Sequence, residues 1–277
     1  YYFLSNDKVD LNKITPIKQK CTVIGIATPD FFHVLSGITA KKISIQRIIA
    51  LDVNAWQLKH FDYIHKLICN TYSRRDFVEK FFCISISSHA DRILSALKVK
   101  HPKQIRGGEE NTGFAELENQ FWSDVRFDST LFESRYGLRA QKTEKGVFIE
   151  SKTIGGFDKY YATLITTDTT AYDFHPFSLR YGQGFLENEK TFKQLKSLLI
   201  NTPCNAFQAD AASDLSEILL VYRYHPIILW TSNIFSPYFT DRNQVLRLAA
   251  QQINNYGSSI KDLPQMDIEV LHDLRCT

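Results

Sequence analysis

Two short apolar segments near the beginning of the chain most constrain its fold, because each leads toward residues with helical spacing. The first, residues 21–30, runs through Cys-Thr-Val-Ile-Gly-Ile-Ala and then turns to Thr-Pro-Asp. The second, residues 47–54, ends in Asp-Val-Asn and is followed by a helical pattern over residues 55–69. An apolar run that ends in a turn predicts a buried strand, and successive strand–helix units are typical of a parallel sheet. The sequence therefore predicts a βαβα unit.

The residues within these two predicted helices indicate where each begins and ends. We expect Thr28 or Asp30 to cap the first helix and Gly37 to close it, as a C-terminal glycine does. The second helix carries apolar residues at helical spacing, namely Trp56, Leu58, Phe61, Ile64, Leu67 and Ile68.

The last third of the chain repeats the alternation of strand and helix. Strands are predicted at residues 203–210, 225–233 and 267–271, and helices at residues 187–200, 211–222 and 241–256. The middle is different: it predicts helices over residues 72–111, a loop at 101–108, a helix over 116–135 and a hairpin or two short strands within 146–172. We therefore expect residues 1–70 and 185–277 to form one doubly wound, mostly parallel α/β sheet, with residues 71–184 as an α+β insertion after the second strand.

Composition narrows the classes of partner. The chain has 33 Lys and Arg against 30 Asp and Glu, a net charge of +3, so no excess of basic charge indicates a nucleic-acid partner. No apolar run approaches the roughly 20 residues that span a bilayer.

The five cysteines form no CxxC pair, which fits neither a disulfide framework nor a zinc site. We expect reduced thiols and a cytoplasmic location. The first residues lack the layout of a signal peptide, although the chain begins without Met.

Polar or small residues follow each predicted strand of the sheet. Gly25 ends the first strand, Asp52 the second, Asp210 the third and the Thr-Ser-Asn run at residues 231–233 the fourth. Ligands of open parallel sheets bind at the carboxyl ends of the strands, where the strand order reverses. A carboxylate at the second strand accepts hydrogen bonds from both ribose hydroxyls, and a glycine at the first turn permits close approach. These positions predict a nucleoside-type cofactor site.

The motifs at these strand ends resemble those of the class I S-adenosylmethionine-dependent methyltransferases, which have a Rossmann-like fold. The matching segments are Val-Ile-Gly-Ile-Ala at residues 23–27, Ile-Ala-Leu-Asp-Val-Asn-Ala-Trp-Gln at 49–57, Phe-Gln-Ala-Asp-Ala at 207–211 and Ile-Leu-Trp-Thr-Ser-Asn at 228–233. The resemblance implies S-adenosylmethionine as cofactor and methyl transfer as the reaction. It also implies a site with Gly25 and Ala27 beside the methionine part, Asp52 at the ribose, Asp210 and Ala211 at the adenine, and Ser232 and Asn233 facing the donor and acceptor. The usual Gly-x-Gly of the family is Gly-Ile-Ala here, and the acidic residue that usually precedes it is absent.

A second resemblance concerns the turn after the second strand. Asp52, Asn54 and Gln57 form an Asp-x-Asn-x-x-Gln run that is similar to the aminocarboxypropyl transferases of betaine-lipid synthesis. This likeness covers roughly residues 20–70 and 185–240, and implies that Asn54 and Gln57 belong to the cofactor site. The transferred group would then be 3-amino-3-carboxypropyl.

The acceptor is left open, with a small molecule, a lipid head group or a protein as alternatives, and Asn233 or Tyr238 is expected to position it. Alkyl transfer from a sulfonium needs alignment and exclusion of water more than a strong acid or base. The alternative function is an inactive, Rossmann-like binding or interaction module. A pocket with Asp52 pointing into it favours the transferase, whereas filling of that space by Phe31 or Trp56 favours the module.

Other chemistries have little support in the sequence. His33, His60 and His65 lie on predicted helices without an HExxH pair, so we expect surface histidines and no metal site. The His-Ala-Asp run at residues 89–91 lacks a nucleophile motif, and no Gly-rich loop with Lys-Ser/Thr is present.

Overall fold

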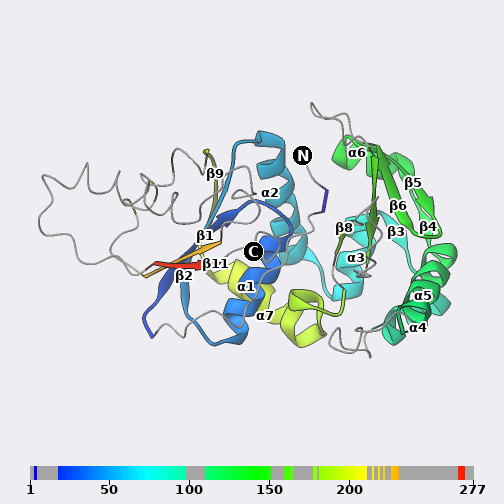
Figure 1. The fold of residues 1–277 in the computed structure, drawn as a ribbon, viewed down its shortest axis with the longest axis horizontal. Coiled ribbons are helices and arrows are strands. Elements are labelled where there is room, and N and C mark those ends of the chain that lie inside the picture. The colour runs from blue at the N-terminus through cyan, green and yellow to red at the C-terminus, as the bar shows by residue number, and fades with distance from the viewer. Residues whose placement is uncertain are drawn as a thin grey trace, which may run out of the picture. The chain divides into compact units, whose positions relative to one another are not determined.

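The computed structural model describes two compact units of the chain (Figure 1). The described residues are 3–4, 18–97, 110–150, 159–164, 177–179, 181–210, 214, 218, 221, 226–230 and 268–271. One unit, here called the parallel-sheet unit, comprises Asp7–Tyr63 and Gln194–Thr277. The other, here called the middle unit, comprises Tyr1–Asn6 and Ile64–Lys193.

The parallel-sheet unit is organised around five strands that all run in the same direction. They are β1 (Cys21–Ile26), β2 (Ile45–Asp52), β9 (Cys204–Gln208), β10 (Ile227–Trp230) and β11 (Ile268–Leu271). Their order across the sheet is β11-β10-β1-β2-β9, and each neighbouring pair is parallel. Every residue of β1 and β10 is buried, which explains why both strands are continuous apolar runs in the sequence. The α/β fold with a parallel sheet is thus confirmed.

Two helices follow the first two strands, as the sequence predicts. They are α1 (Asp30–Ala40) and α2 (Ala55–Asn70). The predicted ends of α1 are wrong at both sides. Pro29 occupies the N-cap position and no side chain caps the helix there. The helix also continues past Gly37 to Ala40, because Ile38 is part of the core, and Lys41 is its C-cap residue.

The middle unit contains two small sheets and most of the remaining helices. Its elements are α3 (Arg74–Phe82), β3 (Ile84–Ser85), α4 (Ser88–Ala96), α5 (Glu110–Asp124), β4 (Arg126–Phe127), α6 (Ser129–Tyr136), β5 (Arg139–Thr143), β6 (Gly146–Glu150), β7 (Lys159–Thr163), β8 (Phe177–Ser178) and the 3-10 helix η3 (Gly184–Leu186). Strands β3 and β4 form an antiparallel pair, and the other sheet has the order β5-β6-β7-β8. The next helix, α7 (Glu189–Asn201), begins in this unit and ends in the parallel-sheet unit.

One prediction for the middle unit is wrong and another is confirmed. The single helix expected over residues 116–135 is two helices, because β4 pairs with β3 and the Asp128 side chain caps α6 by accepting a hydrogen bond from Leu131 N at 2.8 Å. The two strands expected within residues 146–172 are β6 and β7, which pair antiparallel in a larger sheet that begins with β5. The predicted loop at 101–108 and helix at 241–256 lie outside the described residues, as does most of the helix expected at 211–222.

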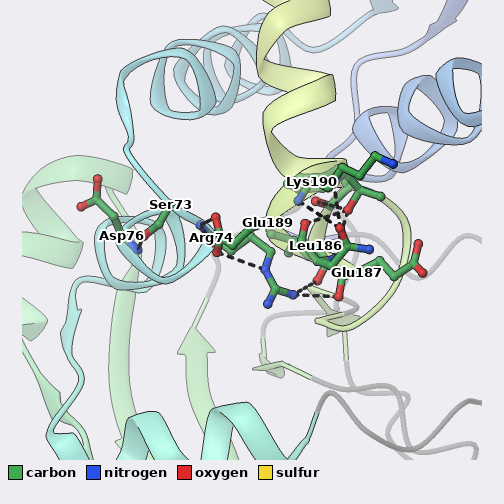
Figure 2. Close-up of polar contacts among 10 residues, drawn as sticks. Ser73, Arg74, Asp76, Leu186, Glu187, Glu189 and Lys190 are labelled. Atoms are coloured by element: carbon green, nitrogen blue, oxygen red, sulfur yellow. Dashed lines mark hydrogen bonds and ion pairs between the residues drawn. The ribbon is translucent and has the colours of Figure 1, made fainter.

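Arg74, a buried arginine at the start of α3, contacts η3 and the start of α7 within the middle unit (Figure 2). Arg74 is only 2% exposed, and its Nη1 donates to the carbonyl oxygens of Leu186 and Glu187 at 2.5 and 2.9 Å. Its Nε donates to Glu189 Oε1 at 3.3 Å, and its guanidinium lies 4.9 Å from the centre of the Tyr181 ring. The start of α3 is therefore fixed against η3 and the start of α7.

Among the described residues, no helix has the length and apolarity required to cross a membrane.

Candidate functional site

The carboxyl ends of β1, β2 and β9 are joined by a chain of hydrogen bonds. Ala27 N donates to Leu51 O at 2.9 Å, which ties the end of β1 to β2. On the other side of β2, Ala209 N donates to Asp52 O at 3.1 Å. The structure thus gathers three of the four predicted strand ends at one edge of the sheet, as parallel pairing requires.

Asp52 is the last residue of β2, and its carboxylate is half-buried. Its Oδ1 accepts a hydrogen bond from Asn54 N at 2.8 Å, so the side chain is held over its own turn. Burial raises the pKa of the Asp52 carboxyl above its ordinary value, with the Asn54 N–H acting in the opposite direction. A fixed, partly desolvated carboxylate at a strand end is suited to accept hydrogen bonds from the hydroxyls of a polar ligand.

Asn54 and Gln57 both act on the backbone around this edge. Asn54 Oδ1 accepts a hydrogen bond from Trp56 N at 2.9 Å, which is the interaction of an N-cap residue at the start of α2. Gln57 is buried, and its Nε2 donates to Ala27 O at 3.0 Å. The two amides therefore fix the turn after β2 and connect α2 to the end of β1.

The space over Gly25 is filled by a side chain of the same unit. A Cβ added to Gly25 would lie 2.5 Å from Cε2 of Phe31 and 2.8 Å from its Cδ2 and Cζ. The Phe31 ring also stacks on Trp230, which pairs with Gly25 in the sheet, with ring centres 5.5 Å apart. The glycine is thus explained by an aromatic ring packed against the backbone. Trp56, whose side chain in this space would also favour the binding module, is 62% exposed.

Two polar atoms near the ends of β1 and β10 are buried without a hydrogen-bond partner among the described residues. They are Oγ1 of Thr28, in the turn between β1 and α1, and Nε1 of Trp230, the last residue of β10. β10 and β2 lie on opposite sides of β1, so the two atoms belong to adjacent strand ends at the centre of the sheet. A buried donor without a partner is uncommon in folded proteins and calls for an explanation.

The remaining predicted site residues are placed only in part. Asp210 is exposed, and its backbone N–H donates to Asp214 Oδ2 at 2.8 Å, the arrangement of a helix start. Ala211, Ser232, Asn233 and Tyr238 lie outside the described residues.

The burial of several polar residues at the α1 and α2 helices was not predicted from the sequence. They are Thr28, Asp30, His33 and His60, together with Gln57, whose burial was not expected. The expectation that His33 and His60 are surface residues is wrong. Gln57 and His60 lie on the same stripe of α2 as Phe61, Ile64 and Ile68, whereas Trp56 lies off it. The helical spacing of Gln57 and His60 relative to the apolar residues of α2 could therefore have predicted their burial, provided that polar residues are also considered for the buried stripe.

A Ser, His and Asp cluster in the middle unit does not form a hydrolytic triad. Ser87 Oγ and His89 Nδ1 both contact Asp124 Oδ2, the latter at 3.5 Å, and Asp124 also accepts from Ala90 N at 2.9 Å. In a triad the histidine lies between the other two groups, whereas here the carboxylate does. Hydrogen bonding from Ser87 lowers the pKa of Asp124, as expected of a group that caps α4.

Within the part of the chain that the structure describes, no group of three or more His, Cys, Asp or Glu side chains is placed to hold a metal ion.

Comparisons with protein-family models, with curated proteins and with solved structures found no significant match to this chain. Its function must therefore be inferred from its own residues and contacts.

Proposed function

We propose that this chain is an S-adenosylmethionine-dependent transferase, that methyl transfer is its reaction, and that the cofactor lies at the carboxyl ends of the parallel strands. The observation that carries the proposal is Asp52, a half-buried carboxylate held at the end of β2 by Asn54 N. The strand order supports it. Numbered along the chain within this sheet, the strands have the order 3-2-1-4-5, which is that of a Rossmann-like sheet, and ligands of such sheets bind where the order reverses.

The residues at this edge fit the adenosyl part of such a cofactor. Asp52 would accept hydrogen bonds from the two ribose hydroxyls, and Asn54 and Gln57 would hold the turn and Ala27 in place around it. Asp210 and Ala211 are proposed at the adenine. Gly25 is different, because the ring of Phe31 lies where a ligand would approach the glycine.

When bound, S-adenosylmethionine supplies an alkyl group made electrophilic by the sulfonium. The chain has to align donor and acceptor and to exclude water, so no strong general base is required. Ser232, Asn233 and Tyr238 are proposed to face the acceptor, whose identity the described residues leave open.

Isothermal titration with S-adenosylmethionine and S-adenosylhomocysteine tests the proposal. Wild type should bind both, and Asp52→Asn should bind each roughly 10- to 100-fold more weakly, because two charge-assisted hydrogen bonds are replaced by weaker ones. Asp62→Asn is the matched control, since Asp62 is an exposed carboxylate on α2. Absence of binding by wild type, or equal binding by wild type and Asp52→Asn, would contradict the proposal.

The products separate the two transferase reactions. Methyl transfer leaves S-adenosylhomocysteine, whereas transfer of the 3-amino-3-carboxypropyl group leaves 5′-methylthioadenosine. Incubation of the protein with S-adenosylmethionine and candidate acceptors, followed by mass spectrometry, therefore distinguishes them.

One observation favours a second candidate, an inactive binding module. Phe31 fills the space over Gly25, which a cofactor needs at the end of β1. If Phe31 stays in this position permanently, the parallel-sheet unit has the fold of a cofactor-binding unit but does not bind the cofactor. Neither S-adenosylmethionine nor S-adenosylhomocysteine should then bind to any variant.

A further inference from the structure

Phe31 lies at the centre of an aromatic stack in the parallel-sheet unit. Its ring stacks on Trp230 at 5.5 Å with an interplanar angle of 17°, and on Phe61 at 6.0 Å and 29°. Its edge lies against the backbone of Gly25, so close that no Cβ is tolerated there. The ring therefore occupies the position over the end of β1 that close approach by a ligand would require.

The polar groups beside this stack are left incompletely satisfied. Trp230 is fully buried, and within the part of the chain that the structure describes its Nε1 has no hydrogen-bond partner; the same is true of Oγ1 of the buried Thr28. Both atoms are donors, and each is placed where a strand adjacent to the reversal of strand order ends. Burial of a donor without an acceptor destabilises the folded state. Two such donors flank the Phe31 position, one in its ring stack and one three residues before it.

We propose that Phe31 is a plug that closes the cofactor site of the ligand-free chain, and that Trp230 Nε1 and Thr28 Oγ1 are the donors that a bound ligand satisfies when the ring leaves. This inference rests on the proposed function. S-adenosylmethionine and its product carry carboxylate, hydroxyl and ring-nitrogen acceptors, which are the groups that these two donors require.

The plug has a thermodynamic consequence for ligand affinity. If only a fraction of molecules has the ring displaced, the apparent dissociation constant equals the intrinsic constant divided by that fraction. Removal of the ring removes this penalty. A permanent core residue would behave differently, since its removal would lower stability without any gain in affinity.

Phe31→Ala and Phe32→Ala form a matched pair, because the two adjacent rings are both fully buried and both stack on Phe61. Both variants should unfold at a lower temperature than wild type. In isothermal titration with S-adenosylhomocysteine, we expect Phe31→Ala to bind about tenfold or more tightly than wild type. Phe32→Ala should keep the wild-type affinity. Phe31→Leu provides a milder variant if Phe31→Ala does not fold.

Trp230→Phe tests the donor, because it keeps an aromatic ring in the stack and removes the five-membered part of the indole together with its N–H. The smaller side chain leaves a cavity at this buried position, so the unfolding temperature should fall. The affinity for S-adenosylhomocysteine should also fall about tenfold, the effect of one hydrogen bond. Unchanged affinity would overturn the assignment of this donor.

The outcomes for the plug and for the proposed function differ. If wild type binds with the expected dependence on Asp52 but Phe31→Ala and Phe31→Leu bind no more tightly, the plug is wrong and the proposed function stands. If wild type does not bind but Phe31→Ala does, the ring blocks a ligand site that wild type does not use, so the blocking role of Phe31 is supported and the proposed function of the wild-type chain is contradicted. If no variant binds, both are wrong and the inactive module is favoured.

Discussion

Gly25 and Phe31 are packed so closely that each determines what the other can be: a Cβ on the glycine would lie 2.5 Å from Cε2 of the ring. In the ligand-free chain, stacking on Trp230 and Phe61 holds the ring in this position. The glycine is therefore a packing requirement of β1 in the ligand-free chain, independent of whether a ligand also uses it.

This contact predicts that Gly25→Ala lowers the free energy of unfolding by about 1–3 kcal/mol, the usual cost of overpacking in a rigid core. In the Phe31→Ala background the added methyl group has room, so the same change should cost much less. Chemical denaturation of the two single variants and the double variant measures the coupling. Additive effects would show that the ring and the glycine do not constrain each other.

Replacement of Asp52 is predicted to have opposite effects on the stability of the fold and on ligand binding. Burial raises its pKa in the folded state, whereas the unfolded chain has the ordinary value of about 3.9. The stability contributed by this group is therefore fully present below the unfolded-state pKa and is lost as pH rises through the folded-state pKa. At neutral pH the half-buried charge destabilises the fold, so Asp52→Asn should unfold at a higher temperature than wild type while binding the ligand more weakly.

Thermal unfolding of wild type and Asp52→Asn across a pH series checks this. The difference in unfolding temperature should be largest near neutral pH and should disappear as pH falls below the unfolded-state pKa of about 3.9, where the carboxyl is protonated in both states. A stabilising effect of the charged carboxylate, visible as a lower unfolding temperature of Asp52→Asn at neutral pH, would contradict the interpretation.

The parallel sheet could be predicted because its central strands are buried on both faces. β1 and β10 are short, mostly apolar runs, and their short length and their Val and Ile content distinguish them from a buried helix. The residues of the turn after β2 could also be predicted from the sequence. Asp52 and Asn54 bond to backbone groups close to them in the chain, and Gln57 bonds to the backbone at the neighbouring strand end. By contrast, β5 was missed because its sequence, Arg-Ala-Gln-Lys-Thr, is polar and its residues are exposed or half-buried.

The environment of Gly25 could not be predicted from the sequence. Whether a glycine at a strand end admits a ligand or a neighbouring ring depends on Trp230, which lies far away in the chain and reaches Gly25 only through strand pairing. His60 shows the same limit on a smaller scale. Its position on the stripe of α2 with Phe61 and Ile64 indicates burial, but hydrophobicity alone ranks the exposed Trp56 above it.

Cys21 predicts a difference in thiol reactivity. The side chain is buried in β1, and burial raises the pKa of its thiol to about 11. The thiolate is the reactive form, so Cys21 should resist alkylation in the native protein. Cys204, in the edge strand β9, is partly exposed and should react earlier. Mass spectrometry after timed iodoacetamide treatment, with and without denaturant, follows each site; equal native rates at the two cysteines would contradict the burial of β1.

Arg74 and Arg75 are adjacent residues whose environments predict very different effects of the same substitution. Arg74 is buried and bonded to two carbonyl oxygens and to Glu189 (Figure 2). The Arg75 side chain is 41% exposed, forms ion pairs with Glu79 and Asp91, and donates to one carbonyl oxygen, that of Ile86, at 2.7 Å. Arg74→Met leaves two backbone carbonyls without their donor, so we expect a loss of about 2–4 kcal/mol in the free energy of unfolding. Arg75→Met should cost about 1 kcal/mol, because it loses one hydrogen bond and exposed ion pairs contribute little.

Denaturant titrations of the two variants provide the comparison, and Arg74→Lys refines it. A lysine keeps the charge but has one nitrogen, so it cannot donate to Glu189 and to both carbonyl oxygens in the same planar arrangement. Most of the loss should therefore persist in Arg74→Lys. Full recovery by lysine would show that charge alone is sufficient at this position, and equal losses for Arg74→Met and Arg75→Met would contradict the role of Arg74 as the group that joins α3 to η3 and α7.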